Sequence, residues 1–358
     1  MTNIDEHGAP VKKPFSMHVD LSQFEPATDA EKMQQEVMGE SVTFWRDGLR
    51  KLMKNPLAVF SLVVLAIIIL TIIIAPMIVP YGYADMITID GMRDKGAKNL
   101  APFQWSEAEQ AYLDAGGKLF PHIFGTDGLC RDYFIRCIYG TRISLSIGFF
   151  ASLLVMCIGV VYGSISGYAG GKVDLIMQRI VDIIYSLPEM LIIILISVVL
   201  DATLKFNGNG ILAKLGTNMI SIFIVFGMLY WVSMARLVRG SVLSIKNNDY
   251  ILAARSIGAS PRRIIFKHIL PNCISVIIVS TALQIPSAIF TESFLSFVGL
   301  GVQAPMPSLG SLANAAREGL SSYPYKLVFP SVIICLIVLS LNLLGDGLRD
   351  AFDPKLRR

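Results

Sequence analysis

The chain alternates between long apolar stretches and shorter polar ones, a pattern that predicts several membrane-spanning helices. A helix needs about 20 mostly apolar residues to cross the hydrocarbon core of a bilayer. The stretches that meet or approach this length are residues 55–84, 143–171, 175–200, 216–235, 269–291 with an extension toward 300, and 327–345. We therefore expect an all-α integral membrane protein with six spans and both chain ends on the same side.

Composition and charge agree with this interpretation. Of the 358 residues, 53% are hydrophobic and only 16% are charged, whereas soluble domains carry about 25% charged residues. The net charge of +4 is small, and the basic residues flank apolar stretches, so we expect them to meet lipid headgroups and not nucleic acid. The five cysteines form no CxxC pair and share no ligand spacing with histidine, so we expect free thiols and no metal site.

The basic flanks also predict the orientation of the chain. Loops rich in Lys and Arg stay on the cytoplasmic side of a membrane. Four basic residues precede the first span and four follow the last one: Arg46, Arg50, Lys51, Lys54, Arg349, Lys355, Arg357 and Arg358. Both termini are therefore expected in the cytosol, and the segment 81–138, with six basic and eight acidic residues, is expected outside.

The two ends of the chain lie outside the predicted spans. Residues 1–40 are polar and have no basic start followed by an apolar core, so we expect a flexible cytosolic tail and no signal peptide. Residues 41–54 combine aromatic and aliphatic side chains with four basic ones, which predicts an amphipathic helix in the membrane interface or one that binds a partner. Residues 350–358 are expected to form a short cytosolic tail.

Between residues 236 and 271 the chain becomes polar and basic, with seven Lys or Arg and a single acid, Asp249. We expect a cytosolic loop of two short helices. Asn248 or Asp249 can cap the first helix, and Gly258 can end it with a positive φ angle. Ser260 and Pro261 suit the start of the second helix, which we expect Pro271 to interrupt.

The first short helix has features of a docking element. The small side chains of Ala253 and Ala254 would let another surface approach closely, and Tyr250, Ile251 and Leu252 would fill a partner's groove. The alternative is an ordinary amphipathic helix that packs on its own bundle. The residues alone leave both possibilities open.

Two acidic residues are candidates for a translocation pathway or gate. Glu189 follows Pro188 in the third span, and Glu292 lies near the outer end of the fifth. Ionisable groups in a membrane usually face a cavity or a partner. The alternatives are a buried structural contact for Glu189 and a water-exposed helix end for Glu292.

We expect no catalytic residues and no ATP hydrolysis by this chain itself. The segment 166–173 has Ser166 where a phosphate-binding loop requires glycine and Val173 where it requires Ser or Thr.

The 236–271 loop resembles that of the inner-membrane permeases of ABC importers, in which an EAA pattern precedes a glycine and then a leucine and proline. In this chain Leu252 takes the place of the glutamate, and the matching residues that follow are Ala253, Ala254, Gly258, Leu270 and Pro271. The stretches YILAARSIGAS, HILPN, LSFVGLGVQAPMPSLG and NLLGDGLRDAFDP, and the stretch HIFGTDGLCRDYFIRCIYGTRISL, are similar to the C-type subunit of oligopeptide and dipeptide permeases. Cys130 stands where that pattern usually has glycine.

This resemblance implies a type I ABC importer permease fold in the cytoplasmic membrane of a bacterium or archaeon. It also implies a homologous second permease, two cytosolic ATPases that bind ATP and Mg²⁺, and an extracytoplasmic peptide-binding protein. The residues implied to couple to an ATPase lie within 248–258 or next to it: Asp249, Tyr250, Leu252, Ala253, Ala254, Arg255, Gly258 and Ala259. The implied cargo is an oligopeptide or dipeptide, although nickel, glutathione or another small solute fits the same features.

Two other classes of function compete with this one. A secondary transporter or channel working alone is expected to show paired intramembrane carboxylates, broken helices or internal repeats, and the chain shows no convincing repeat. A membrane scaffold that does not transport would use the 236–271 loop merely to bind a cytosolic protein.

Overall fold

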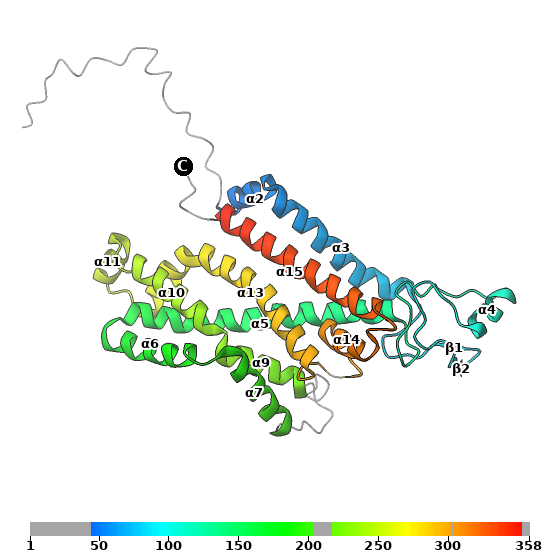
Figure 1. Cartoon of the computed structure of the whole chain (residues 1–358). Coiled ribbons are helices and arrows are strands. Elements are labelled where there is room, and N and C mark those ends of the chain that lie inside the picture. Colours follow the sequence, from blue (N-terminus) through cyan, green and yellow to red (C-terminus); the bar gives the residue numbers. More distant parts are fainter. Residues whose placement is uncertain (1–43, 204–216, 303, 353–358) are drawn as a thin grey trace, which may run out of the picture. The chain divides into compact units, whose positions relative to one another are not determined.

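A computed structural model describes residues 44–203, 217–302 and 304–352, and helices dominate this part of the chain (Figure 1). Five helical stretches in it are long and apolar enough to cross a membrane. They are formed by α3 (Pro56–Ile78), α5 (Tyr133–Ala169), α9 (Thr217–Leu229) with α10 (Trp231–Ile245), α12 (Pro261–Ile264) continuing into α13 (Leu270–Val298), and α15 (Tyr325–Phe352). The predicted tail 1–40 and the last residues of the predicted tail 350–358 lie outside the described residues.

The third predicted span is a bent pair of helices. α6 (Gly171–Tyr185) and α7 (Glu189–Thr203) meet at an angle of 85°. Pro188 stands at the break, where its missing N–H prevents the helix from continuing. The described part of the chain therefore holds six spans when this bent pair counts as one, although the apolar stretch 175–200 is not a straight rod.

Two spanning helices are longer than their apolar stretches. α5 begins at Tyr133 and not near residue 143, because the Asp132 carboxylate caps it by accepting the Ile135 N–H at 2.9 Å. α10 continues to Ile245, well past residue 235. The prediction that a loop begins at Arg236 was therefore wrong, since a helix can remain regular after its side chains become polar.

The predicted interruption at Pro271 was also wrong. A π-helical turn, η2 (Ile265–Ile269), joins α12 to α13, and the Leu270 N–H donates to the Ile265 carbonyl. Pro271 follows in the first turn of α13, where a proline needs no N–H. The chain thus passes from the polar loop into a membrane span without a corner at Pro271.

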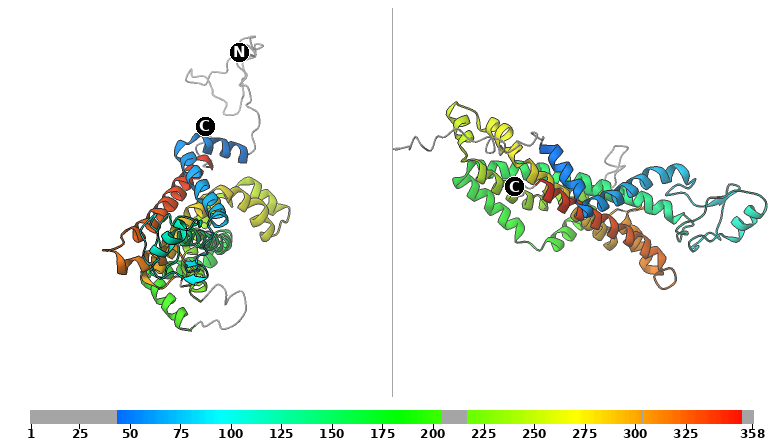
Figure 2. Two further views of the ribbon diagram at one scale, coloured as in Figure 1. Left: turned by 90° about the vertical axis from the view of Figure 1, so that its right-hand side faces the viewer. Right: turned by 90° about the horizontal axis from the view of Figure 1, so that it is seen from above.

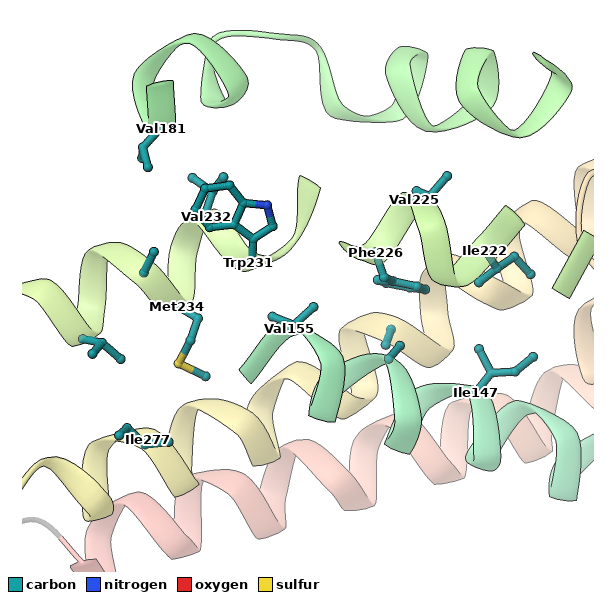
Figure 3. Close-up of a cluster of buried hydrophobic side chains, with 14 of the residues drawn as sticks. Ile147, Val155, Val181, Ile222, Val225, Phe226, Trp231, Val232, Met234 and Ile277 are labelled. Atoms are coloured by element: carbon teal, nitrogen blue, oxygen red, sulfur yellow. The ribbon is translucent and has the colours of Figure 1, made fainter. Parts of the chain in front are cut away.

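The core lies where α5 packs against α10 and α13. Figure 3 shows Val155 of α5, Phe226 of α9, Met234 of α10 and Ile277 of α13 in one cluster of buried side chains. The backbones of α5 and α10 approach closely, because a Cβ atom at Gly163 would lie only 2.4 Å from the Ala235 carbonyl oxygen. A small residue at this position permits the contact.

The predicted amphipathic segment forms α2 (Phe44–Lys54). The Trp45 ring lies edge-on to that of Phe352, with centroids 5.6 Å apart, and Leu52 is buried. Leu49 and Met53 remain exposed. One part of the apolar surface of α2 therefore packs against α15, and the other part is free to meet the membrane interface.

Residues 79–132, which we call the 79–132 segment, connect α3 to α5. The segment contains a two-stranded antiparallel sheet, β1 (Thr88–Ile89) with β2 (Met92–Arg93), and the helix α4 (Glu107–Asp114). The Phe124 ring stacks on that of Phe329 at 4.0 Å, and the Tyr325 hydroxyl donates to the Leu100 carbonyl at 2.8 Å. The start of α15 thus anchors this segment, which lies at the end of the bundle opposite α11 (Asp249–Ser256) in both Figure 1 and Figure 2.

A buried histidine joins α4 to the start of α5. The two ring nitrogens of His122 lie 2.8 Å from carboxylate oxygens of Glu109 and Asp132, and none of the three side chains is accessible to any significant extent. Burial lowers the pKa of His122, but the hydrogen bonds to Asp132 and Glu109 outweigh it and raise this pKa from 6.5 to about 9. The His122 side chain is therefore protonated at neutral pH and pairs with both carboxylates as an imidazolium.

The His122 bridge predicts a loss of stability at alkaline pH. Because the folded-state pKa is raised, the contribution of the bridge is fully present below pH 6.5 and disappears as the pH rises through about 9. We expect the melting temperature of the purified protein to fall by a few degrees between about pH 6 and about pH 10. His122→Gln should reduce this difference, whereas His268→Gln should preserve it. An unchanged pH difference in His122→Gln would contradict the assignment.

Candidate functional site

The polar loop forms the predicted pair of short helices around Gly258. α11 begins after Asn248, whose backbone is extended but whose side chain makes no capping hydrogen bond. Gly258 has a φ of +83°, as predicted, and its N–H donates to the Arg255 carbonyl at 3.0 Å. Ser260 caps α12 by accepting the Arg263 N–H at 3.4 Å. A glycine suits this turn because its backbone has a positive φ.

α11 presents one face to the bundle and the other outward. Ile251 is fully buried in the core cluster, and Ala254 is 7% exposed. By contrast, Ile257 is 85% exposed, and Tyr250 and Leu252 are each 44% exposed. The expectation that Ile251 and Ala254 are available to a partner was therefore wrong, because both pack against their own chain.

The other predicted coupling residues lie on the outward side. Asp249, Ala253, Arg255 and Gly258 are exposed, and Ala259 is half-buried. The Arg255 guanidinium also lies 5.7 Å from the centroid of the Tyr168 ring of α5. The structure thus shows that α11 packs on its own bundle with one face and exposes apolar side chains on the other, while docking of that exposed face to a partner stays a prediction.

Two exposed apolar residues at this end were missed by the sequence reasoning. Ile257 lies one helical turn beyond Ala253 and two turns beyond Tyr250, so the spacing of α11 indicated it. Phe266 is 60% exposed and lines a hollow of about 410 Å³ with Ser260, Arg262 and Arg263. Nothing in the sequence pointed to Phe266, because its outward position depends on the π-helical turn.

Two ion pairs to α6 and one hydrogen bond to α5 hold the end of α10 that leads into the loop. The Arg239 guanidinium donates to both carboxylate oxygens of Asp174 at 2.6 Å. The Lys246 ammonium donates to the Gly167 carbonyl at 2.9 Å, and Arg236 pairs with Asp182 at 2.9 Å. These contacts fasten α10, the helix that precedes α11, to α6 and α5.

A cavity of about 710 Å³ lies beside the bend between α6 and α7. Residues of α9, α10, α13 and α15 complete its lining, and none of its described lining residues is charged. Its polar residues are Tyr185, Tyr230, Ser233, Gln284, Ser287, Thr291 and Asn342. The hydroxyls of Tyr230 and Thr291 lie 2.7 Å apart and form a hydrogen bond across this lining.

The amide side chains of Gln284 and Asn342 face this cavity without a hydrogen-bond partner in the described part of the chain. Both residues belong to membrane-spanning helices, α13 and α15. An unpaired amide is costly in lipid. This face of the bundle therefore suits contact with water, a ligand or another protein, and does not suit contact with acyl chains.

The two acidic candidates do not line this cavity together. Glu189 begins α7 next to the lining residue Met190, but its side chain lies outside the described residues. Glu292 is fully buried, so the alternative of a helix end in contact with water is wrong. Its neighbour Thr291 faces the cavity, while Glu292 points to other parts of the bundle.

The Glu292 carboxylate joins three parts of the structure. It accepts hydrogen bonds at 2.7 Å from the hydroxyls of Ser144 on α5 and Ser296 on α13. The Ser296 hydroxyl in turn accepts the Val302 N–H at 3.1 Å, beyond the end of α13. The arrangement assigns Glu292 a supporting position behind the cavity wall.

Comparisons with known proteins agree over most of the chain. The family model for binding-protein-dependent transport system inner membrane components matches residues 159–358, and that for the N-terminal transmembrane domain of oligopeptide transport permease C matches residues 43–102. The chain is 39% identical over 347 residues to the oligopeptide transport system permease protein OppC of Bacillus subtilis (strain 168), covering 95% of this chain and 99% of the relative. It is 41% identical over 319 residues to the dipeptide transport system permease protein DppC of the same organism, covering 89% and 88%.

Removing the Glu292 carboxylate should destabilise the bundle. Glu292→Leu leaves the Ser144 and Ser296 hydroxyls without their acceptor, which we expect to cost about 2 kcal/mol. Glu292→Gln keeps one acceptor oxygen and should cost less. Thermal unfolding of the purified protein measures both, and equal stability of the wild type and Glu292→Leu would show that the carboxylate has no supporting role.

Proposed function

Because the chain belongs to the binding-protein-dependent transport system inner membrane components, we propose that it couples to a cytosolic ATPase through α11 and conducts peptides through the cavity beside α6 and α7. The chain is a multi-pass permease subunit of a bacterial ABC importer of the oligopeptide and dipeptide type. This family works with a second permease and with ATPases.

The exposed apolar surface of α11 is the single observation that carries the coupling proposal. Tyr250, Leu252 and Ile257 are exposed at the end of the bundle, on a helix whose other face is buried in the core. An apolar helix face of this kind binds in a hydrophobic groove of a partner. Asp249, Ala253, Arg255 and Gly258 are also exposed and would lie in the same contact.

The packing of α11 suits it to transmit force. A coupling element moves a bundle only when it is packed at both ends and has discrete positions. Ile251 and Ala254 fix α11 to the bundle, while the ion pairs of Arg239 and Arg236 connect α10 to α6. In this proposal, closure of the ATPases displaces α11, and the bend between α6 and α7 changes with it.

We assign ATP, Mg²⁺ and the hydrolysis of ATP to the ATPase subunits. In this proposal no residue of the present chain is catalytic. From the basic residues that flank the spans we infer that α11 and both termini lie in the cytosol, and that the 79–132 segment lies outside the inner membrane. An extracytoplasmic peptide-binding protein delivers the cargo on that side.

The lining of the 710 Å³ cavity favours a peptide. A path for peptides of varied sequence needs groups that bind the backbone and few fixed charges that would select side chains. Gln284 and Asn342 each offer an amide donor and an amide acceptor, which match the N–H and C=O groups of a peptide. A homologous permease would close the open side of this path.

Ile257→Asp tests the coupling proposal. The side chain is 85% exposed, so the substitution should leave the fold intact but place a charge in an apolar contact. We expect loss of the ATPase subunits on purification in mild detergent and loss of ATP-dependent tripeptide uptake by reconstituted vesicles. Met92→Asp, at a similarly exposed apolar site in β2, is the control. Normal assembly and uptake by Ile257→Asp would refute the proposal, and uptake by the isolated chain would favour a transporter working alone.

The double variant Gln284→Leu with Asn342→Leu tests the cargo. Removing both amides should raise the KM for uptake of uncharged tripeptides about tenfold, an effect of about 1.4 kcal/mol, and leave assembly with the ATPases intact. The same assay with nickel and glutathione distinguishes the alternative solutes. Uptake of these solutes, and not of peptides, by the wild-type complex would show that the cargo is not a peptide.

A further inference from the structure

A second cavity, of about 480 Å³, lies between the 79–132 segment and the connection from α14 (Leu309–Ala316) to α15. The lining residues that matter here are Asp127, Leu129, Arg131, Arg136, Glu318 and Lys326. Three of them are cations and two are acids. The cavity shares no lining residue with the 710 Å³ cavity, so it is a separate site.

The only buried carboxylate in this lining is already in use. One Asp127 oxygen accepts the backbone N–H groups of Leu129 and Arg131, at 2.8 and 2.9 Å. The other accepts the Arg131 guanidinium at 2.7 Å. Asp127 therefore has little capacity left for the other two cations.

Those two cations are buried. Arg136 is 7% exposed and Lys326 is 8% exposed. Arg136 donates to the Tyr83 carbonyl at 3.1 Å, but its Nε atom has no hydrogen-bond partner in the described structure and lies 3.5 Å from Asp127. The Lys326 Nζ donates to the neutral amide oxygen of Asn99 and lies 4.4 Å from the centroid of the Tyr323 ring, with no carboxylate at ion-pair distance among the described residues.

Buried cations without a full counter-charge make a site for an anion. Burying a charge is costly unless it is paired. Arg136 and Lys326 line the same cavity, in which Asp127 is engaged by Arg131 and the other acid, Glu318, is exposed. A further carboxylate in the cavity would supply the missing counter-charge.

We propose that this cavity receives a carboxylate side chain of the extracytoplasmic peptide-binding protein when that protein docks. The proposal rests on the proposed function, which places the 79–132 segment on the outer side of the membrane. Leu129, at the same cavity, is 48% exposed and supplies an apolar contact beside the charged anchor. Protein interfaces combine apolar contacts with a few buried charged anchors in this way.

The walls of the cavity are preorganised. The Tyr133 hydroxyl donates to the Lys326 carbonyl at 2.7 Å, and the His122 bridge holds α4 to the start of α5. A partner that docks here therefore meets a rigid surface and pays little for ordering it. A carboxylate of the transported peptide fits less well, because the cavity is not continuous with the proposed path.

Lys326→Met tests the proposal in the assembled complex in lipid nanodiscs. The probe is the soluble form of the cognate peptide-binding protein, and the measurement is its dissociation constant for the complex. We expect binding about tenfold weaker or more, with a weaker dependence on salt. Lys326→Arg should retain binding. Lys95→Met, at an exposed lysine of the 79–132 segment, should have no effect.

A second variant covers the case in which Lys326→Met does not fold. Leu129→Asp places a carboxylate of this chain next to the cations, so it should compete with the partner and also weaken docking. Docking of Lys326→Met or Leu129→Asp with wild-type affinity would overturn the proposal. It would also be overturned if Lys326→Met raised only the KM for peptide, because the anion would then be the cargo. Failure of the proposed function gives a different result, namely absence of peptide uptake by the wild-type complex.

Discussion

Polar groups inside a membrane must find partners within the protein or face water, and this constraint organises the structure. Glu292 satisfies it with serine hydroxyls from α5 and α13, and Asp174 satisfies it with Arg239. Gln284 and Asn342 have no partner in the described part of the chain, and both line one cavity. The paired groups therefore support the bundle, and the two unpaired amides mark the surface that we propose meets cargo.

α5 connects the two functional ends of the chain. Its first residue, Tyr133, holds Lys326 beside the cationic cavity, and its other end bears Gly167, which accepts from Lys246 at the base of α11. Between them, close packing at Gly163 keeps α10 against α5. One rigid helix thus joins the proposed receptor site to the proposed ATPase site, so that docking outside and closure inside act on the same bundle.

Much of this architecture was predictable from the sequence, because apolar length and loop charge follow directly from membrane physics. The apolar stretches located the spans, and the cap residues around Gly258 and Ser260 located two short helices. The failures have specific causes. The start of α5 at Tyr133 depends on its cap, Asp132, and the end of α10 at Ile245 depends on packing that continues after the apolar stretch ends. The continuous helix through Pro271 depends on a π-helical turn that no local pattern indicates. The departure from the family pattern at Cys130 occurs at a positive φ of 58°, a conformation that favours glycine.

The proposed contact between α11 and a cytosolic ATPase is the interaction on which transport by this chain most depends. Photo-crosslinking from an unnatural side chain at position 257 in the intact complex tests this contact directly, with position 92 in β2 as the reference. The account predicts an adduct with the ATPase from position 257 and none from position 92. An adduct of position 257 with the extracytoplasmic binding protein, or the absence of any ATPase adduct from it, would contradict the central claim.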